Sequence, residues 1–279
     1  MRLRCGRHTL NLDIPVVMGV LNVTPDSFSD GGRFVALPAA LAQAERMAHE
    51  GAAIIDVGGE STRPGAAPVD VGEELRRVIP VVEKLVERIQ LPVSVDTSKP
   101  EVMRAAIAAG ASMINDVYAL REPGAIDTVA KSEVAICLMH MQGEPRTMQK
   151  EPRYADVLVE VRDFLRGRVA RCVDAGIAAS RLVIDPGFGF GKTVEHNLEL
   201  LRRLRELAAD GCPVLAGLSR KSMIDKLTGR TDGERLGGSL ALAMLAILGG
   251  ARIVRAHDVG PTVDAIRIVT AMNGRHGES

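Results

Sequence analysis

The sequence predicts a (β/α)8 barrel, a fold of the α/β class, and three observations lead to this prediction. The chain has 279 residues, and one barrel domain of this kind takes ~250 residues. Short β-branched and apolar runs alternate with longer amphipathic stretches along nearly the whole chain. No Ser-rich linker or low-complexity segment interrupts this alternation, so residues 1–279 are expected to form a single domain.

Eight apolar runs are the candidate strands. In chain order they are 16–22, 52–58, 92–96, 112–116, 134–140, 181–185, 213–219 and 252–257. Near-continuous apolar runs are typical of a parallel sheet, because its strands are buried on both faces. A closed barrel leaves no strand edge exposed, whereas a doubly wound open sheet is the alternative architecture.

The segments between the strands have the composition of crossover helices. Amphipathic stretches cover 41–51, 72–89, 155–176 and 193–211, and three of these four end in a glycine at the position of a helix C-cap. The most apolar stretch, 240–248, is far shorter than the ~18 residues of a membrane span. It is expected to be a buried helix that packs on the barrel and against a second subunit of a homodimer.

Charge and composition argue against two classes of partner. The chain has 35 basic and 35 acidic residues, only 3% aromatic residues and no Trp. It therefore lacks the overall charge expected for binding nucleic acid or an anionic membrane. The four cysteines are scattered and form no CxxC pair, which fits reduced thiols in the cytoplasm.

Polar residues occur where the candidate strands end, which is where barrel enzymes place their active sites. These residues are Asn22, Asp56, Asp96, Asn115, His140, Asp185, Ser219, Arg255 and His257. Two of the following loops, 24–34 and 59–70, are unusually long and contain Gly and Pro. Such loops are expected to act as lids over the site.

The residue types at this end of the barrel indicate two kinds of ligand group. Cationic groups suited to a phosphate or diphosphate are supplied by Arg63, Lys221, Arg255 and His257. Acceptors suited to a heterocycle with adjacent N–H donors are supplied by Asp96, Asn115 and Asp185. The alternative for the carboxylates is a structural role, as helix N-caps or as ion-pair partners of Lys221 and Arg255.

Familiar motifs for nucleotides and for zinc are absent from the sequence. The segment 186–193, PGFGFGKT, has Pro186 where a phosphate loop needs its first Gly, and Lys192 where a dinucleotide fingerprint needs its last Gly. No HExxH or CxxC spacing indicates zinc. A hard Mg²⁺ shared with a diphosphate is expected instead. Lys221 as a Schiff-base lysine is a minor alternative.

Long motifs spread over nearly the whole chain resemble those of the bacterial dihydropteroate synthase family. They include NVTPDSFSDGG (22–32), IIDVGGESTRPGA (54–66), SVDTSKP, INDV, LMHMQGEPRTMQ, IDPGFGFGKT, GLSRKS and RAHDVG, in the order of the family. The resemblance implies a barrel that joins (7,8-dihydropterin-6-yl)methyl diphosphate to 4-aminobenzoate. The products would be 7,8-dihydropteroate, for folate biosynthesis, and diphosphate, with Mg²⁺ as the cofactor.

The resemblance also implies a role for each matching residue. Asp96, Asn115, Asp185 and Lys221 would hold the pterin. Arg255, Thr62, His257 and Asn22 would contact the diphosphate, and Asn22 also Mg²⁺. The 4-aminobenzoate pocket would comprise Phe28, Arg63, Pro64, Phe190, Ser219 and Lys221. The residues expected to take part in catalysis are Asn22, Asp96, Lys221, Arg255 and His257.

The resemblance implies a dissociative substitution in which the arylamine is the nucleophile, and sulfonamides as inhibitors. Two other functions remain alternatives. One is a pterin-binding methyltransferase barrel, which has no diphosphate to expel. The other is a non-catalytic pterin-binding homologue.

Overall fold

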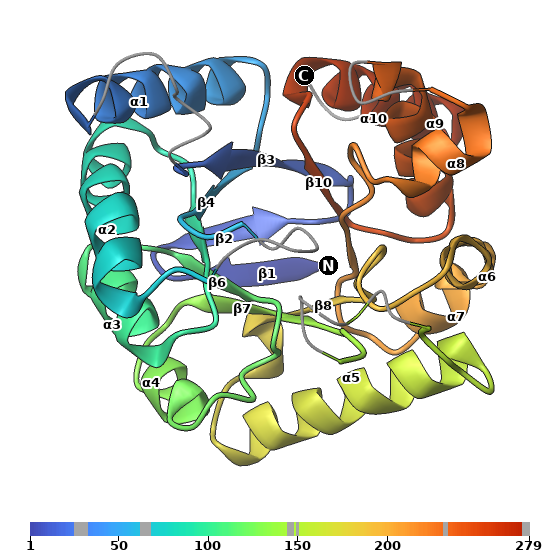
Figure 1. Ribbon diagram of the computed structural model, residues 1–279, viewed down its shortest axis with the longest axis horizontal. Coiled ribbons are helices and arrows are strands. Elements are labelled where there is room, and N and C mark those ends of the chain that lie inside the picture. Colours follow the sequence, from blue (N-terminus) through green and yellow to red (C-terminus); the bar gives the residue numbers. More distant parts are fainter. Residues whose placement is uncertain (25–32, 62–67, 144–147, 149–150, 231–233, 275–279) are drawn as a thin grey trace.

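The fold is a ring of parallel strands surrounded by helices (Figure 1), as seen in a computed structural model that describes residues 1–24, 33–61, 68–143, 148, 151–230 and 234–274. The strands are β3 (Val16–Asn22), β4 (Ile54–Gly58), β5 (Val93–Asp96), β6 (Met113–Asp116), β7 (Ala135–Met139), β8 (Leu182–Asp185), β9 (Leu215–Ala216) and β10 (Ile253–Ala256). Their order in the sheet is β8-β7-β6-β5-β4-β3-β10-β9. A parallel bridge between Ile184 and Val214 joins the two ends. The predicted barrel is confirmed, and the open sheet is not observed.

The helices lie on the outside of the ring (Figure 1). They are α1 (Arg33–His49), α2 (Val71–Arg88), α3 (Pro100–Ala108), α4 (Ala125–Ala130), α5 (Val157–Asp174), α6 (Val194–Arg202), α7 (Leu204–Ala208), α8 (Met223–Thr228), α9 (Leu236–Leu248) and α10 (Val259–Met272). Several begin at side chains that accept from the first backbone N–H groups, as Asp70 does for α2 and Asp156 for α5. These caps explain why the helices start where the amphipathic pattern starts.

The predicted strand 213–219 is much shorter than expected. Only Leu215–Ala216 forms β9, and the chain then leaves the sheet. Arg220 adopts a left-handed backbone conformation, with φ of +56°, and its N–H donates to Ser239 Oγ at 3.0 Å. The polar residues around position 220 therefore lie on a turn and not on a strand.

An antiparallel hairpin closes the amino-terminal end of the barrel, and the sequence analysis did not predict it. It consists of β1 (Arg2–Cys5) and β2 (His8–Asn11). Leu3, Cys5 and Leu12 are fully buried and pack in one cluster with inward residues from the strands, such as Met18 and Ile54. Strands of four residues are too short for the alternation of apolar and polar residues to predict them.

Strand alternation divides the barrel interior into an apolar and a polar half. On β4, Ile54 belongs to the interior cluster, whereas Ile55 belongs to the larger core between strands and helices. Two residues further along, Asp56 has the same inward direction as Ile54. The interior is thus filled by apolar side chains near the hairpin and becomes polar toward the carboxyl ends of the strands.

The helix predicted at 240–248 is present, and within the single chain only one of its faces is buried. Leu242 and Ile247 of α9 are buried, but Leu245 is 52% exposed and Leu248 is 39% exposed. None of the helices in the described ranges has both the length and the apolar character needed to cross a bilayer.

Candidate active site at the carboxyl end of the barrel

Most of the polar residues predicted from strand ends converge at the carboxyl end of the barrel. The register of the sheet places Asp96 opposite Asn115 and opposite Gly58, and Gly58 opposite Asn22. Gly58 matters here because the Asn22 Oδ1 atom lies 3.6 Å from where a Cβ on that glycine would be. Neighbouring strands therefore present side chains of one polar layer toward a common space.

Arg255 forms the centre of this layer. Its Nε donates to Asp56 Oδ2 at 2.7 Å, and its Nη2 donates to Asp96 Oδ2 at 3.0 Å. The Asn115 amide donates to the same Asp56 oxygen at 3.1 Å. Asp96 thus has the ion-pair partner that the structural alternative required, and Arg255 is held between two carboxylates.

Burial and charge shift the pKa values of this layer. Burial raises the pKa of Asp96 to about 7, against the opposing effect of the Arg255 guanidinium, with Asp56 and Asp116 adding to the rise. Burial also raises the pKa of Asp185. It acts against the charged form of Arg255, but the Asp56 and Asp96 carboxylates outweigh burial and raise the pKa of Arg255. Titration near neutral pH in a cluster of this kind is typical of functional sites.

Lys221 and Phe190 meet at the side of the polar layer. The Lys221 ammonium lies 4.1 Å from the centre of the Phe190 ring, within the range of a cation–π contact. Burial lowers the pKa of Lys221 to about 8, although the carboxylate of Asp185 opposes this effect. Asp185 itself accepts from the backbone N–H of Gly187 at 2.7 Å. The lysine is therefore a cation of reduced basicity above an aromatic face.

Ser219 and His257 form a second pair beside this layer. The Ser219 hydroxyl lies 3.0 Å from His257 Nδ1 and also accepts from the His257 backbone N–H at 3.2 Å. Next to them, Arg220 donates to both carboxylate oxygens of Asp258, at 3.1 and 2.6 Å. The turns after β9 and β10 are thereby fastened together. Ser219 and His257, predicted for different substrates, are in direct contact.

Four predicted site residues, Phe28, Thr62, Arg63 and Pro64, lie outside the described residues, as do most of the residues of the two predicted lids. Their placement therefore stays a prediction.

Two features of the site were not predicted from the sequence, and one residue predicted for the site lies elsewhere. Asp56 was recognised as a strand end but not as a site residue, although it binds both Arg255 and Asn115. Its position in phase with Ile54 was the available signal. The Arg220–Asp258 ion pair carried no signal, since it depends on two turns that are distant in sequence. His140, predicted to face the site, instead contacts the buried Lys192 at 2.9 Å.

The described residues would supply only some of the ligands of a Mg²⁺ ion. Within the described ranges, no group of three or more His, Cys, Asp and Glu side chains could hold a metal ion. Asn22 offers a neutral oxygen, a ligand type that suits Mg²⁺, and this ion usually keeps several waters or phosphate oxygens as further ligands. The donor set therefore fits a metal held jointly by Asn22 and a diphosphate.

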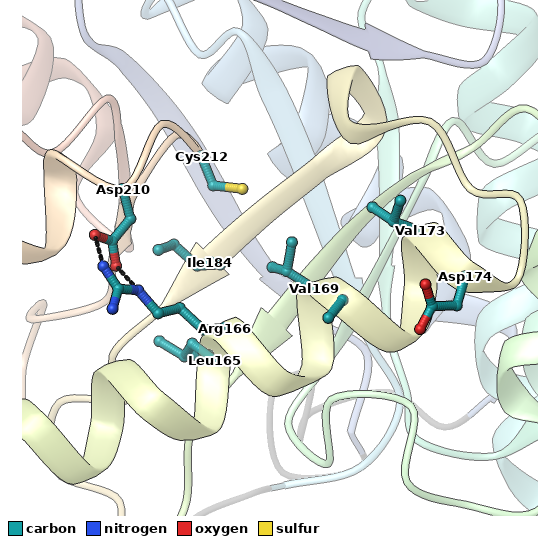
Figure 2. A pocket seen from close by; sticks show the side chains of 9 residues that line it. Leu165, Arg166, Val169, Val173, Asp174, Ile184, Asp210 and Cys212 are labelled. Atoms are coloured by element: carbon teal, nitrogen blue, oxygen red, sulfur yellow. Dashed lines mark hydrogen bonds and ion pairs between the residues drawn. The ribbon is translucent and has the colours of Figure 1, made fainter.

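A separate cavity of about 310 Å³ lies on the outside of the barrel, between α5 and β8. Figure 2 shows its apolar lining, which includes Leu165, Val169 and Ile184, and the Arg166–Asp210 ion pair at one end. Ile184 points outward, because its neighbour Val183 faces the barrel interior. This cavity is therefore distinct from the polar layer.

The chain is similar to known proteins over nearly its whole length. A family model described as pterin binding enzyme matches residues 18–257. The dihydropteroate synthase of Escherichia coli K12 is 54% identical over 271 residues, which cover 97% of this chain and 96% of that protein. The chain belongs to the pterin binding enzyme family, and within it to the dihydropteroate synthases.

Two solved structures support the same conclusion. The Xanthomonas albilineans dihydropteroate synthase with 4-aminobenzoic acid has a TM-score of 0.92 and 55% identity, covering 98% of each chain. The Yersinia pestis dihydropteroate synthase with a sulfonamide drug complex has a TM-score of 0.93 and 50% identity, covering 98% of this chain and 100% of that one.

Proposed function

We infer that this protein is a transferase that joins (7,8-dihydropterin-6-yl)methyl diphosphate to 4-aminobenzoate, releasing 7,8-dihydropteroate and diphosphate in folate biosynthesis. One observation carries this inference: acceptor side chains and the cation Arg255 meet in one polar layer at the carboxyl end of the barrel, with a second cation, Lys221, at its side. A methyltransferase that uses an intact methylated folate has no leaving diphosphate, so it has less need of the cations.

The acceptors of the layer suit the pterin. Asp96, Asn115 and Asp185 would take up the N–H groups along one edge of the ring, because a carboxylate accepts two parallel hydrogen bonds from neighbouring donors. Asp96 accepts from Arg255 at 3.0 Å. We propose that the pterin takes over Asp96 while Asp56 keeps Arg255 in place.

The cations suit the leaving group. Arg255 and His257, with Thr62 and Asn22, would contact the diphosphate. Ser219 keeps His257 in position through two contacts. When bound, Mg²⁺ would neutralise charge on the diphosphate, and Asn22 would supply a protein ligand.

The amine pocket would lie beside Lys221, with Phe190, Phe28 and Pro64 as apolar walls and Ser219 and Arg63 near the carboxylate of 4-aminobenzoate. Sulfonamides would compete for this pocket. Lys221 would border both substrates.

No protein nucleophile is needed for this chemistry. The C–O bond between the methylene carbon and the diphosphate breaks first, and its electron pair leaves with the diphosphate. The dihydropterin delocalises the resulting positive charge, and the Asp96 carboxylate stabilises it electrostatically. The arylamine nitrogen then forms the new C–N bond and loses a proton.

We also propose that the protein is a homodimer and works in the cytoplasm. Leu245 and Leu248 on α9 and Ile268 and Met272 on α10 are exposed apolar residues on two helices that pack together. A second subunit would cover them. The cysteines Cys5, Cys137, Cys172 and Cys212 are unpaired, which suits a reducing compartment.

The decisive experiment measures diphosphate release from the pterin substrate with Mg²⁺, with and without 4-aminobenzoate. We expect release to depend on the amine, to yield pteroate and to be lost in Lys221→Ala. Lys226→Ala, on the exposed face of α8, is the matched control and should keep full activity. Tight pterin binding without release would favour the methyltransferase or the non-catalytic homologue, and methyltetrahydrofolate would then be the next substrate to test.

A further inference from the structure

Lys192 is a buried lysine at the end of the glycine-rich segment after β8, and the proposed reaction gives it no part. Its exposed fraction is only 3%. It is the residue that made 186–193 look like a phosphate loop, but its ammonium is engaged inside the protein. A buried lysine needs several acceptors to be tolerated.

The Lys192 Nζ atom has three partners within 3.0 Å and a longer contact of 3.5 Å with the His140 carbonyl oxygen. It donates to the carbonyl oxygens of Gly187 and Phe190, each at 3.0 Å, and contacts His140 Nδ1 at 2.9 Å. These three match the three N–H bonds of an ammonium. Burial, aided by the Lys192 charge, lowers the pKa of His140 to about 2, so its imidazole is neutral and can accept.

These contacts fasten two loops whose backbones touch. Gly187 has a φ of +68°, and a Cβ there would lie 1.9 Å from the His140 carbonyl oxygen. Gly191 has a φ of +61°, and a Cβ there would lie 2.5 Å from the Gln142 carbonyl oxygen. The loop after β8 therefore rests directly on the loop after β7, and Lys192 bonds to both.

The 187–190 turn, which Lys192 holds, also carries Phe190, the proposed aromatic wall of the amine pocket. Phe190, whose carbonyl Lys192 binds, presents its ring to Lys221 at 4.1 Å. A Cβ on Gly189 would lie 3.2 Å from Lys221 Cδ, so the turn also supports the stem of that lysine. On its other side, the turn donates through Gly187 to Asp185 at 2.7 Å.

We propose that Lys192 and His140 are positioning residues for the amine substrate: together they hold the 187–190 turn so that Phe190 and Lys221 keep the shape of the amine pocket. This inference rests on the proposed roles of Phe190 and Lys221. Neither Lys192 nor His140 is proposed to touch a substrate.

The test compares steady-state constants for both substrates in four single variants and one double variant. Lys192→Met keeps the length of the side chain and removes its donors. His140→Leu removes the imidazole acceptor and leaves the backbone carbonyl, whereas His140→Asn keeps a polar atom near the place of Nδ1. Lys131→Met, exposed at the carboxyl end of α4, is the matched control. The double variant Lys192→Met with His140→Leu measures the coupling.

We expect Lys192→Met and His140→Leu to raise the KM for 4-aminobenzoate at least about tenfold, with the KM for the pterin diphosphate within about twofold of the unaltered chain. His140→Asn should restore most of the difference. The double variant should lose no more than the worse single variant, because both remove one arrangement. If Lys192→Met fails to fold, the comparison of His140→Leu with His140→Asn tests the proposal by itself.

Three outcomes would overturn the proposal: an unchanged KM for the amine, an equal rise in both KM values, or an additive loss in the double variant. A merely structural role would lower kcat or the active fraction without this selectivity. Absence of amine-dependent release by the unaltered chain would instead overturn the proposed function itself. The two failures are therefore distinguishable.

Discussion

At the scale of single residues, the site depends on Asp56, a carboxylate that contacts two other residues of the polar layer. Asp56 is fully buried, and its Oδ2 atom accepts from both Arg255 and Asn115. Its Oδ1 atom has no hydrogen-bond partner among the described residues. One oxygen thus positions Arg255 and Asn115, both proposed to contact the pterin diphosphate, and its negative charge holds Arg255.

Asp56→Asn should impair use of the pterin substrate. The amide keeps the shape but removes the charge that holds Arg255, and a lost bond to a charged group costs about 1.5–3 kcal/mol. We expect kcat/KM for the pterin diphosphate to fall by about 10- to 100-fold. Asp127→Asn, exposed on α4, should match the unaltered chain. Equal kinetics in the two variants would contradict the role of Asp56.

The raised pKa of Asp96, about 7, predicts opposite effects of pH on activity and stability. Below this pKa the protonated group is a poor acceptor for the pterin, so kcat/KM should fall as pH drops through 7. The folded state binds the extra proton between the ordinary carboxyl value and 7, so in this window Asp96 lowers stability as pH rises.

The Asp96→Asn variant, which has no titrating group at this position, tests both effects. Between pH 5 and pH 8, urea unfolding should show a larger loss of stability in the unaltered chain than in the variant. The acid limb of the kcat/KM profile should be present in the unaltered chain and absent from any residual activity of the variant. A flat profile between pH 5.5 and pH 8 in the unaltered chain would argue against this assignment.

At the scale of elements, the loops after the strands are shaped by backbone contact. The β8 loop touches the His140 carbonyl at a position where only glycine fits. The turn after β9 instead holds Arg220 at a φ of +56°, and its ion pair with Asp258 offsets the strain that a side chain meets in this region. At these positive φ values, glycine occurs at position 187 because a neighbouring backbone is close, whereas Arg220 has space for a side chain that forms an ion pair.

Gly187→Ala tests this distinction. Both Gly187 and Gly124 have positive φ values, +68° and +82°, but a Cβ on Gly124 would meet nothing within 4 Å. Alanine at Gly124 should therefore cost only the conformational penalty of about 1–2 kcal/mol. Alanine at Gly187 should cost more, because the His140 carbonyl must move. The measurement is the free energy of unfolding in urea, and equal losses at both positions would refute the contact.

At the scale of the whole molecule, the barrel has two apolar surfaces that would contact water unless another segment or subunit covers them. The amino-terminal end of the barrel interior is covered by the β1–β2 hairpin, through Leu3, Cys5 and Leu12. The apolar face of α9 and α10 has no cover within the described part of the chain, as the exposed Leu245 and Ile268 show. The first surface is covered when the single chain folds, whereas the second would be covered in the proposed dimer.

Leu3→Ala tests whether the hairpin and the barrel fold as one unit. Removing a fully buried leucine should cost about 2–5 kcal/mol. If residues 1–279 form a single domain, as predicted, the loss should appear as one shifted transition in urea, with the same midpoint by circular dichroism and by activity. Arg2→Ala, exposed on the same strand, is the control. Two separate transitions would show that the single-domain prediction is wrong.

Ile268→Glu tests the proposed dimer. Ile268 is 66% exposed on α10, and a buried charge there would oppose association. We expect the unaltered chain to have the mass of a dimer by light scattering at micromolar concentration, and the variant that of a monomer. Val159→Glu, at a 46% exposed position on α5, should remain a dimer. A monomeric unaltered chain would contradict the proposal.

The sequence by itself determined the barrel, the places of its strands along the chain and most of the polar residues at its carboxyl end. This was possible because apolar runs and polar strand ends are local features, and because parallel strands bring their carboxyl ends to one side. Only the tertiary structure decided which residues contact one another: Arg255 with Asp56 and Asp96, Lys192 with His140, and Ser219 with His257. Such pairs join segments far apart in the chain, and their geometry depends on barrel closure and on the backbone conformation of turns, which no local pattern encodes.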